Sequence, residues 1–482
     1  MTADQADLER PPRVAAPSSE AIIGNAHELL DHGLTELRQV VLDIAEAGLR
    51  AAHPGRAVER LVRYDGRLLQ AGGRAFDLAA ASSIVVLGAG KASVAIGAAI
   101  EQMLGDAITH GLIVIPRASS HALRRIDVMT ADHPVPSTAS WEAGRRLAEI
   151  AAGLGPGVLL ITAFTGGSSA LACLPPDGVT FAAKQRLHTL LLESGASIAE
   201  INTVRKHVSA IKGGRLAALA HGATILNLTV SDVVGDHVDL LCDPAVQDTT
   251  TSSGAITVLK RLGLWREVPA EVREHLHGGA SESPSLSGRD ITTTVLLTGA
   301  DVLPQMANQA SALGWRPVLL GSQLDGEAAG LGGFLGTLAA ESSAHASPFS
   351  PGTVLIAAGG EATVTLRHPG ADGHGQGGPN QEMALAFARS AGRNHAAVAG
   401  VFLDSDGSDG GTAAAGGCVD STTARRAVDR SLFLDDVLAR HDATAALSYL
   451  GDLVRTGPTG TNVSDIWVMA IGAADGRAGT PG

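Results

Sequence analysis

The feature that most constrains the fold of this chain is a repeated alternation of short apolar runs, glycine loops and helix-like segments. The apolar run 84–87 leads into a glycine loop at 88–93 and then into a helical pattern at 94–104. Further apolar runs that predict strands lie at 112–115, 158–162, 223–230, 292–297, 317–320, 354–358, 398–403 and 466–471. Strand, glycine loop and helix in succession are typical of an α/β fold with a mainly parallel sheet. In such sheets ligands bind beyond the carboxyl ends of the strands, where these glycine loops are expected to lie.

The chain of 482 residues is long enough for two domains, and its pattern changes near the middle. Pro, Gly, Ser and His accumulate between residues 262 and 289, where the apolar pattern weakens. We therefore predict an N-terminal α/β domain over 20–285 and a C-terminal α/β domain over 290–475, which begins with the run 292–297. Residues 1–19 are polar and contain prolines, and we expect them to form a flexible tail.

Charge and composition exclude several classes of protein. The chain has 36 basic and 49 acidic side chains and a net charge of −13, so it lacks the basic excess of a nucleic-acid-binding protein. Its three cysteines are too few and too scattered for a disulfide framework or a zinc ribbon, which favours a cytoplasmic location. The N-terminus has no apolar core typical of a secretory signal, and no apolar run is long enough for a membrane span. We expect neither a nucleic-acid nor a membrane partner; the oligomeric state stays open, with a homodimer as one option.

The loop 88–93 is the first candidate anion site. Gly88 and Gly90 would let the backbone approach an anion closely, and the helix that follows near Ser93 would offer free N–H groups. Lys91 adds a full positive charge. The spacing matches neither the Walker A motif nor the dinucleotide fingerprint. The alternative is a plain strand–helix turn with a solvated lysine.

A second candidate anion site lies in the loop 165–171. The backbone amides of Gly166 and Gly167 and the hydroxyls of Ser168 and Ser169 could hold a phosphate or a carboxylate. A serine hydrolase is disfavoured, because the loop lacks the G-x-S-x-G arrangement of a nucleophile elbow.

Cationic residues are concentrated in the segment 202–215, which begins with Asn202 and includes Arg205, Lys206 and Lys212. On a helix, Arg205 and Lys212 would share a face. In an acidic protein, a basic cluster beside glycine loops favours an anionic ligand. A solvated basic face is the alternative.

Carboxylates follow two of the predicted strands. Asp232 and Asp236 follow one strand, and Asp406 and Asp409 lie in a loop after another. Oxygen-rich loops of this kind suit Mg²⁺ that is held together with substrate phosphates. The second loop is not an EF-hand, because Ala415 stands where the twelfth-position glutamate is needed. Asx-turns that only shape the loops are the alternative.

Two later glycine loops complete the set. The loop 375–382 opens a helix that Asn380 could cap, with Glu382 in its first turn, and the loop 457–465 has a similar composition. Glycine cradles, a basic cluster and carboxylates for a cation are together what phosphoryl transfer requires. The residues alone therefore predict an α/β enzyme that uses ATP or another phosphate compound.

As an ordered set, these motifs resemble the class II glycerate 2-kinases, the family with a C-terminal MOFRL domain whose members often carry the name hydroxypyruvate reductase. The matching segments run in family order and are 88–93, 133–136, 166–171, 202–214, 231–236, 359–361, 375–382, 406–410 and 457–465. The resemblance implies a Rossmann-like, mainly parallel N-terminal domain and a smaller α/β MOFRL-type domain, with the active site in the cleft between them. It implies transfer of the γ-phosphate of ATP, with Mg²⁺, to the 2-hydroxyl of D-glycerate or a related small hydroxy acid.

The motifs and the resemblance together nominate site residues for three roles. The candidate catalytic residues are Lys91, Asp232, Asp236, Arg205 and Lys212. The candidate ATP-binding residues are Gly88, Gly90, Ser93, Gly166, Gly167, Ser168, Ser169, Asn202, Lys206, Gly377, Gly378, Asn380, Glu382, Thr459 and Asn462. The candidate Mg²⁺ ligands are Asp406, Asp409 and Glu361. By its match to the family lysine, Lys91 would hold the substrate carboxylate or the developing phosphoryl charge.

Two positions depart from the family pattern. Where the family has Ser-Gly-Pro-Thr, this chain has Cys242, Asp243, Pro244 and Ala245, which removes two hydroxyls and adds a carboxylate. Where the family has an arginine in its Gly-Gly-Arg-Asn loop, this chain has Pro379, which has neither a charge nor a backbone N–H. Arg205 and Arg367 are candidate substitutes for that arginine.

These departures keep two alternatives open. One is a kinase of the same fold with a changed hydroxyl acceptor, such as a polyol, and the other is a catalytically inactive homologue that binds a nucleotide or metabolite. A nicotinamide-dependent hydroxypyruvate reductase is disfavoured, because the loop after residue 87 does not extend to G-x-G-x-x-G and ends in Ser93.

Overall fold

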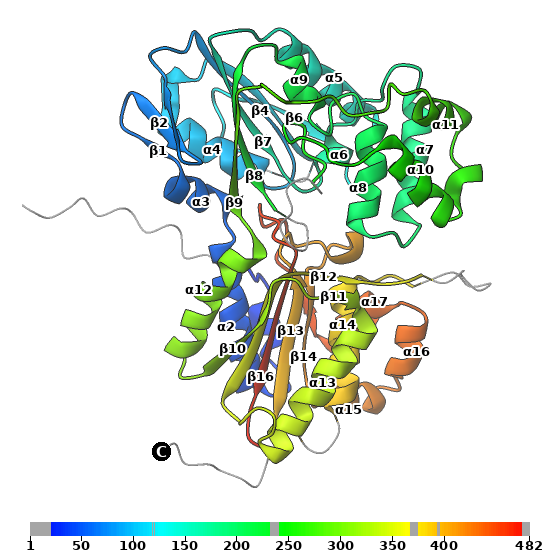
Figure 1. Ribbon diagram of the computed structural model, residues 1–482. Helices are drawn as coiled ribbons and strands as arrows, with labels where there is room; N and C mark the ends of the chain where they lie inside the picture. Colours follow the sequence, from blue (N-terminus) through cyan, green and yellow to red (C-terminus); the bar gives the residue numbers. More distant parts are fainter. Residues whose placement is uncertain are drawn as a thin grey trace, which may run out of the picture.

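The computed structural model describes residues 21–117, 119, 121–231, 241–366, 375–392 and 396–474, which form two α/β lobes, one above the other in Figure 1. The predicted tail 1–19 and three of the residues singled out above, Asp232, Asp236 and Arg367, lie outside the described residues. Within the described part of the chain, no helix is both long enough and apolar enough to cross a membrane.

The first lobe is built on a six-stranded sheet in which every neighbouring pair is parallel. In spatial order its strands are β6 (Asp127–Ala131), β5 (His110–Pro116), β4 (Ser83–Ala89), β7 (Val158–Phe164), β8 (Thr224–Val230) and β9 (Ile291–Leu297). This arrangement confirms the predicted mainly parallel sheet. The chain order reverses at β4 and β7, and ligands bind at such switch points in open α/β sheets.

The inner strands are apolar along their whole length because helices cover both faces of the sheet. Val86 of β4 packs in one cluster with α4 (Ser93–Leu104). Leu87 packs in another cluster, on the opposite face, with α5 (Thr138–Ala152) and α9 (Arg215–Leu219). Burial on both faces holds the strand ends, and the loops that follow them, in fixed positions.

Two smaller units flank this sheet. A helical unit with its own apolar cluster is formed by α7 (Phe181–Leu192), α8 (Ile198–His207), α10 (Ser252–Arg261) and α11 (Ala270–His277). A three-stranded antiparallel sheet is formed by β1 (Arg63–Tyr64), β2 (Leu68–Ala71) and β3 (Arg74–Asp77). The helical unit carries part of the basic segment predicted at 202–215.

The second lobe is built on a mixed sheet, and the combination of two α/β units confirms the predicted fold class. Its strands, in spatial order, are β10 (Arg316–Gly321), β12 (Thr353–Thr363), β16 (Asp465–Ile471), β13 (Val398–Asp404), β14 (Gly416–Asp420) and β15 (Leu453–Val454), and β11 (Asp325–Glu327) pairs with the end of β12. One face packs against α13 (Ala328–His345) and α14 (Pro379–Ala391). The other face packs against α2 (Thr35–Ala51) and α12 (Gly299–Ala312). The remaining helices of this lobe are α1 (Ala26–Leu29), α15 (Thr423–Asp429), α16 (Leu434–Ala439) and α17 (Ala443–Leu450).

The chain crosses between the lobes twice, and this differs from the sequence-based division at 285–290. The strand predicted at 292–297 pairs with β8 and belongs to the first sheet, not the second. Helix α2 packs on β13 and β16 of the second lobe, although its residues precede the whole first lobe. The crossings lie between α2 and α3 (Pro54–Leu61), and between β9 and α12. Periodicity along the sequence predicts neither placement, because one depends on strand pairing at a sheet edge and the other on helix packing against a sheet face.

Candidate active site

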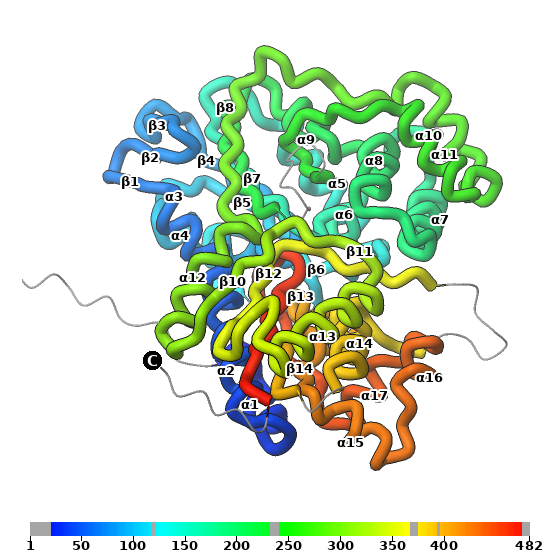
Figure 2. The backbone as a smooth tube through the Cα atoms, turned by 60° about the horizontal axis from the view of Figure 1, so that its bottom comes forward, coloured from blue at the N-terminus to red at the C-terminus, as the bar shows by residue number. Residues whose placement is uncertain are grey.

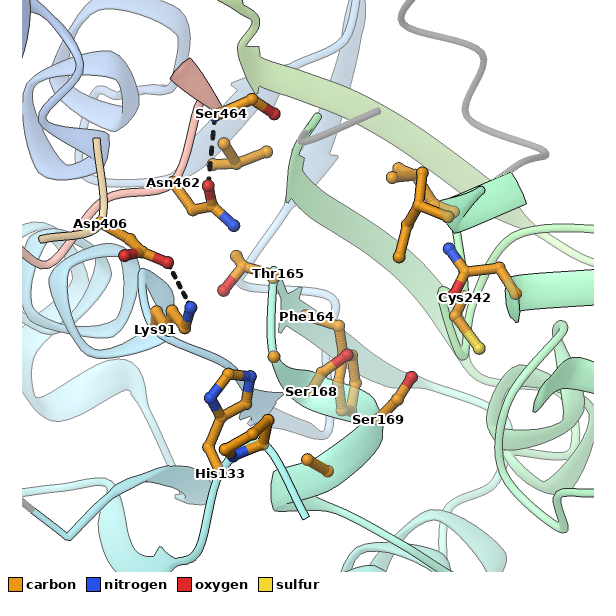
Figure 3. A pocket seen from close by; sticks show the side chains of 18 of the residues that line it. Lys91, His133, Phe164, Thr165, Ser168, Ser169, Cys242, Asp406, Asn462 and Ser464 are labelled. Carbon is orange, nitrogen blue, oxygen red and sulfur yellow. Dashed lines mark hydrogen bonds and ion pairs between the residues drawn. The ribbon is translucent and has the colours of Figure 1, made fainter. Parts of the chain in front are cut away.

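A cavity of about 270 Å³ lies where the carboxyl ends of β4, β7 and β8 meet loops of the second lobe. The first lobe contributes mainly basic and hydroxyl side chains, and the second lobe contributes carboxylates. Figure 3 shows both sets around the same space, with Lys91 and Asp406 on one side and Ser168, Ser169 and Cys242 on the other.

The turn after β4 places Lys91 at the rim of this cavity. Gly90 has a φ of +138°, and a Cβ there would lie 2.2 Å from Thr165 Oγ1, so the position needs glycine. A Cβ at Gly88 would lie 2.6 Å from the Ala163 carbonyl oxygen of the neighbouring strand. The two glycines therefore allow close packing of β4 against β7, and neither lines the cavity.

Ser93 has a similar structural place. It is fully buried at the start of α4, and its hydroxyl lies 3.3 Å from Thr165 Oγ1. The Ala92 amide also donates to Thr165 Oγ1, at 3.2 Å. Thr165 lines the cavity whereas Ser93 does not, so the hydroxyl exposed to the cavity belongs to a residue that was not among the predicted site residues.

Lys91 forms an ion pair with Asp406, which lies in the loop after β13 of the other lobe. The Asp406 side chain is 3% exposed and that of Lys91 is 20% exposed. A charge pair with this little solvent contact interacts more strongly than one on the surface. It joins the two lobes at the cavity itself.

The loop after β7 lines the cavity with all four of its predicted residues, Gly166, Gly167, Ser168 and Ser169. Gly167 has a φ of +83°, the left-handed conformation that glycine adopts without strain. The Ser168 hydroxyl accepts a hydrogen bond of 2.8 Å from Lys212 Nζ. The loop thus presents backbone amides and hydroxyls beside a buried cation.

Arg205 lines the basic end of the cavity, and Lys212 lies behind the wall there, hydrogen-bonded to the lining Ser168. Lys212 is buried, lies 5.3 Å from the centroid of the Phe164 ring, and has its pKa lowered to about 8, chiefly by burial. Arg205 lines the cavity, and its Nε is buried with no hydrogen-bond partner among the described residues. Buried polar groups are normally paired, so an unpaired guanidinium nitrogen here indicates a place for an anion.

Two histidines that were not among the predicted site residues, His133 and His188, complete this basic end. Burial, helped by Lys91 and Arg205, lowers the pKa of His133 to about 3. Burial and Arg205 lower the pKa of His188 well below its usual value, and its Nε2 lies 2.8 Å from Arg205 Nη2. Both rings are therefore neutral at physiological pH and serve as hydrogen-bonding groups. The segment 133–136 carried the only sequence signal for His133, through the family resemblance.

The departure at residues 242–245 lies directly in the cavity wall, where Cys242 and Asp243 both line it. Asp243 accepts hydrogen bonds from the Ala245 amide at 2.7 Å and from Asn227 Nδ2 at 3.3 Å. Burial raises the pKa of its carboxyl, while Lys212 acts in the opposite direction. Asp243 therefore places a carboxyl group close to the basic end of the site.

The acidic end is formed by Asp404, Asp406, Asp465 and Glu361 of the second lobe. Burial and the neighbouring Asp406 raise the pKa of Asp404 well above its usual value, and Lys91 acts in the opposite direction. Burial likewise raises the pKa of Asp465. Crowded, desolvated carboxylates of this kind are stabilised when a cation enters the space between them.

The predicted Mg²⁺ ligands do not form one centre. Asp406 and Glu361 line the cavity, but Asp409 does not. Asp409 instead accepts hydrogen bonds from the backbone amides of Asn380 and Gln381, at 3.1 and 2.9 Å, and so caps the start of α14. Burial raises its pKa to about 7. Among the described residues, no three His, Cys, Asp or Glu side chains are grouped closely enough to hold a metal by themselves.

The loop before α14 supports the acidic end from behind. Gly377, Gly378, Asn380 and Glu382 were nominated for ATP binding, yet none of them lines the cavity. Asn380 Nδ2 donates to Asp465 Oδ1 at 2.6 Å, so this asparagine positions a carboxylate that does line it. Glu382 lies 2.8 Å from the ring of His441, and a Cβ on Gly378 would collide with Asp409.

Of the remaining nominated residues, Asn202 and Asn462 line the cavity, whereas Lys206 and Thr459 do not. Lys206 Nζ lies 2.6 Å from Asp248 in a fully buried ion pair. The Thr459 hydroxyl donates to the carbonyl of Ser405 and so holds the loop that carries Asp404 and Asp406. Position along the helix did not separate Lys206 from Arg205, because adjacent residues point in different directions and only packing decides which one meets the cavity.

The fold and the cavity define an enzyme of two α/β lobes with a basic and an acidic end facing each other, which suits reactions of phosphate groups. Sequence comparison agrees with this class. The profile of DUF4147, a domain of unknown function, matches residues 40–277, and that of the MOFRL family matches residues 354–465.

Individual relatives give the same result. The chain is 34% identical over 447 residues to a glycerate 2-kinase from Pyrococcus horikoshii, which covers 92% of this chain and 99% of that protein. It is 37% identical over 393 residues to a protein from Agrobacterium vitis named putative hydroxypyruvate reductase, covering 80% and 87%. The crystal structure of glycerate kinase from Thermotoga maritima matches with a TM-score of 0.73 and 31% identity, over 90% of this chain and 99% of that chain. The chain belongs to the class II glycerate kinase family, as the resemblance predicted.

Proposed function

We propose that this protein is an ATP-dependent glycerate kinase that phosphorylates the 2-hydroxyl of D-glycerate or of a related small hydroxy acid. The observation that carries the proposal is the single cavity with opposite charge at its two ends, closed by the ion pair between Lys91 and Asp406. Phosphoryl transfer depends on positioning and on stabilisation of charge, and both lobes contribute to each.

The basic end suits the carboxylate of a hydroxy acid. Arg205 supplies positive charge there, Lys212 adds to it from behind Ser168, and neutral His133 and His188 supply hydrogen-bonding groups. Bidentate pairing with a guanidinium is a strong interaction for a carboxylate or a phosphate. An acceptor held in this way would keep its 2-hydroxyl near the middle of the cavity.

The loop 166–169 and Lys91 suit the phosphate groups of ATP. Backbone amides and the hydroxyls of Ser168 and Ser169 would hold phosphate oxygens. Lys91 is placed where it can leave its ion pair with Asp406 and contact the phosphoryl group during transfer. A positive charge that meets the transferring group lowers the barrier because negative charge is spread over its oxygens there.

The acidic end fits a Mg²⁺ ion that enters together with ATP. Mg²⁺ commonly takes only one or two carboxylates from the protein and completes its octahedron with phosphate oxygens and water. Asp406 and Asp404 would supply these carboxylates, and the raised pKa of Asp404 reflects the crowding that a cation would relieve. When bound, the ion would neutralise phosphate charge.

ADP release with ATP and Mg²⁺ tests the proposal, with D-glycerate, L-glycerate and a panel of hydroxy acids and polyols as acceptors. Release that depends on D-glycerate is expected. It would show that Pro379 is tolerated in place of the family arginine. Absence of release with every hydroxy acid in the panel would overturn the proposed reaction.

A second candidate is a kinase of the same fold with a less anionic acceptor, and Asp243 favours it. This carboxylate lines the cavity, interacts electrostatically with Lys212 behind the wall, and offsets part of the positive charge that a hydroxy acid would use. Turnover of polyols but not of glycerate would favour this candidate.

The three cysteines are free thiols, which supports a cytoplasmic location, and a homodimer stays a prediction.

A further inference from the structure

A second cavity, of about 550 Å³, lies on the opposite side of the α2 and α12 helices from the second sheet and is separate from the active site. It is lined by residues of α2, α3 and α12, which lie together at one side of the junction between the lobes in Figures 1 and 2. Its volume is within the range of small-molecule sites. None of its lining residues lines the active-site cavity.

Three arginines line this groove, which is unusual for a protein with a net charge of −13. Arg50 pairs with Glu46 at 2.7 Å. Arg56 and Arg60 lie one helical turn apart on α3, and neither forms an ion pair among the described residues. Two guanidinium groups at this spacing on one helix face can contact the same anion.

The opposite wall carries little negative charge. Its one carboxylate, Asp301, already accepts hydrogen bonds from the amide and hydroxyl of Thr298, both at 2.9 Å. Gln305, Asn308 and Gln309 follow it along α12, and their side-chain amides make no hydrogen bond within the described part of the chain. Amides of this kind can bind the hydroxyl groups of a ligand whose anionic part is held by arginine.

The groove also spans both crossings between the lobes. Arg50 and Arg56 lie on either side of the first crossing, and Leu297 and Asp301 lie on either side of the second. These are the two connections about which the lobes can move relative to each other. A ligand that contacts both sides of each connection would favour one arrangement of the lobes over others.

A direct contact links the first crossing to the active site. The Thr461 hydroxyl donates a hydrogen bond to the carbonyl of Ala52, the residue that ends α2 at this crossing. The next residue, Asn462, lines the active-site cavity. The crossing is therefore connected through two adjacent residues to a loop that lines the active-site cavity.

We propose that this groove, formed by Arg50, Arg56, Arg60 and the α12 amides, binds the phosphate group of a small metabolite and adjusts closure of the lobes over the active site. Arginine favours phosphate because its planar guanidinium matches two phosphate oxygens. The binding site is independent of the reaction proposed above, whereas its effect on closure concerns any substrate that the cavity takes.

Calorimetric titration of the full chain with inorganic pyrophosphate at low ionic strength tests the site. The groove variant is Arg56→Ala/Arg60→Ala. The matched control is Arg425→Ala/Arg440→Ala, which removes two exposed arginines of the second lobe that line neither cavity. We expect the groove variant to lose one class of binding sites, or at least about tenfold in its affinity, while the control behaves as wild type. Equal binding by the two variants would overturn the proposal.

Kinetics tests the effect on closure. Pyrophosphate that competes only at the active site would change the KM for the acceptor equally in wild type and in the groove variant. If pyrophosphate also acts through the groove, it should change the KM of wild type and of the control further. The groove variant should lack this additional change. Equal changes in all three proteins would overturn the regulatory role. The calorimetric result does not require turnover, so failure of the proposed reaction would be distinguishable from failure of the groove site.

Discussion

The ion pair between Lys91 and Asp406 connects residues 315 positions apart in the chain and joins the two lobes at the cavity. Lys91 is held by the β4–α4 turn of the first lobe, and Asp406 by the loop after β13 of the second. The pair therefore forms only when both lobes are folded and docked.

Replacing Lys91 with alanine should lower kcat/KM by about 100-fold or more, because an electrostatic contact to the transferring group is lost. The fold should survive, since Lys91 lies at the rim and the turn depends on Gly90. Steady-state ADP release and thermal unfolding measure the two effects. Lys260→Ala, an exposed lysine on α10, is the matched control. A folded Lys91→Ala enzyme with the turnover of wild type would contradict the assignment.

Asp406 and Asp409 should respond differently to alanine substitution, although only three positions separate them. Asp406→Ala should remove most of the turnover, because its carboxylate faces the cavity. Asp409→Ala should lower the free energy of unfolding by about 3 kcal/mol, because α14 loses its cap and buried amides lose their acceptor. Denaturant unfolding and ADP release separate the two outcomes. A stable Asp409→Ala protein without activity would instead place Asp409 in the reaction.

The burial of Lys212 should appear in the pH dependence of substrate binding. Its pKa is lowered to about 8, so the side chain is charged at pH 7 and loses its proton as the pH rises through about 8. An anionic acceptor should then bind more weakly, and kcat/KM should fall above this pH. An ordinary lysine would stay charged up to about pH 10.

The Lys212→Arg variant is the control for this prediction, because arginine keeps its charge over the whole range. Its kcat/KM should lack the alkaline decrease, whatever its absolute value. The same decrease in both enzymes would show that another group titrates, and Lys212 would then have no direct part in binding the acceptor.

Asp243 should influence the pH at which kcat/KM begins to fall. Its negative charge raises the pKa of Lys212, in opposition to burial. Asp243→Asn removes the charge but keeps an oxygen that can accept from the Ala245 amide. The alkaline decrease in kcat/KM should therefore move to lower pH. An unchanged pH profile would mean that Asp243 has no electrostatic effect on the site, and Asp31→Asn, an exposed aspartate of the second lobe, should show no shift.

Gly90→Ala should destabilise the first lobe. The new Cβ would lie 2.2 Å from Thr165 Oγ1, and the φ of +138° is strained for alanine. We expect a loss of about 2 kcal/mol or more in the free energy of unfolding, measured by denaturant titration. Gly73→Ala, at a positive φ with open space around it, tests the backbone strain alone. Equal losses in the two variants would show that the contact with Thr165 does not matter.

Much of the site could be predicted from local patterns. A glycine loop after an apolar strand predicted that 166–169 and Lys91 would lie at the binding site, and both line the cavity. The same pattern nominated Gly377, Gly378 and Asn380 for ATP binding, and these three do not line the cavity. Here the loop packs behind the acidic end, and Asn380 contacts Asp465 instead of the cavity. The loop 166–169 and the loop before α14 both precede a helix, so their local patterns are alike. Only packing against the rest of the protein decides which loop lines the cavity.

His133 and His188 show what the local pattern lacks. Apart from the family match at 133–136, nothing around either histidine suggests a binding role. Packing between distant segments brings His133 close to Lys91 and Arg205, and His188 close to Arg205. Lys206 and Arg205 are adjacent in sequence, yet one forms a buried pair with Asp248 and the other faces the cavity. The direction of each side chain follows from how α8 docks, which no short stretch of residues encodes.

The sequence by itself determined the α/β class, the glycine loops at strand ends and the membership of a kinase family, because apolar periodicity and motif order are local properties of the chain. The tertiary structure alone decided that β9 joins the first sheet, that α2 packs on the second, and that basic and acidic groups meet in one cavity. Strand pairing and helix docking bring together residues hundreds of positions apart, and their free energy depends on surfaces that exist only after both lobes have folded.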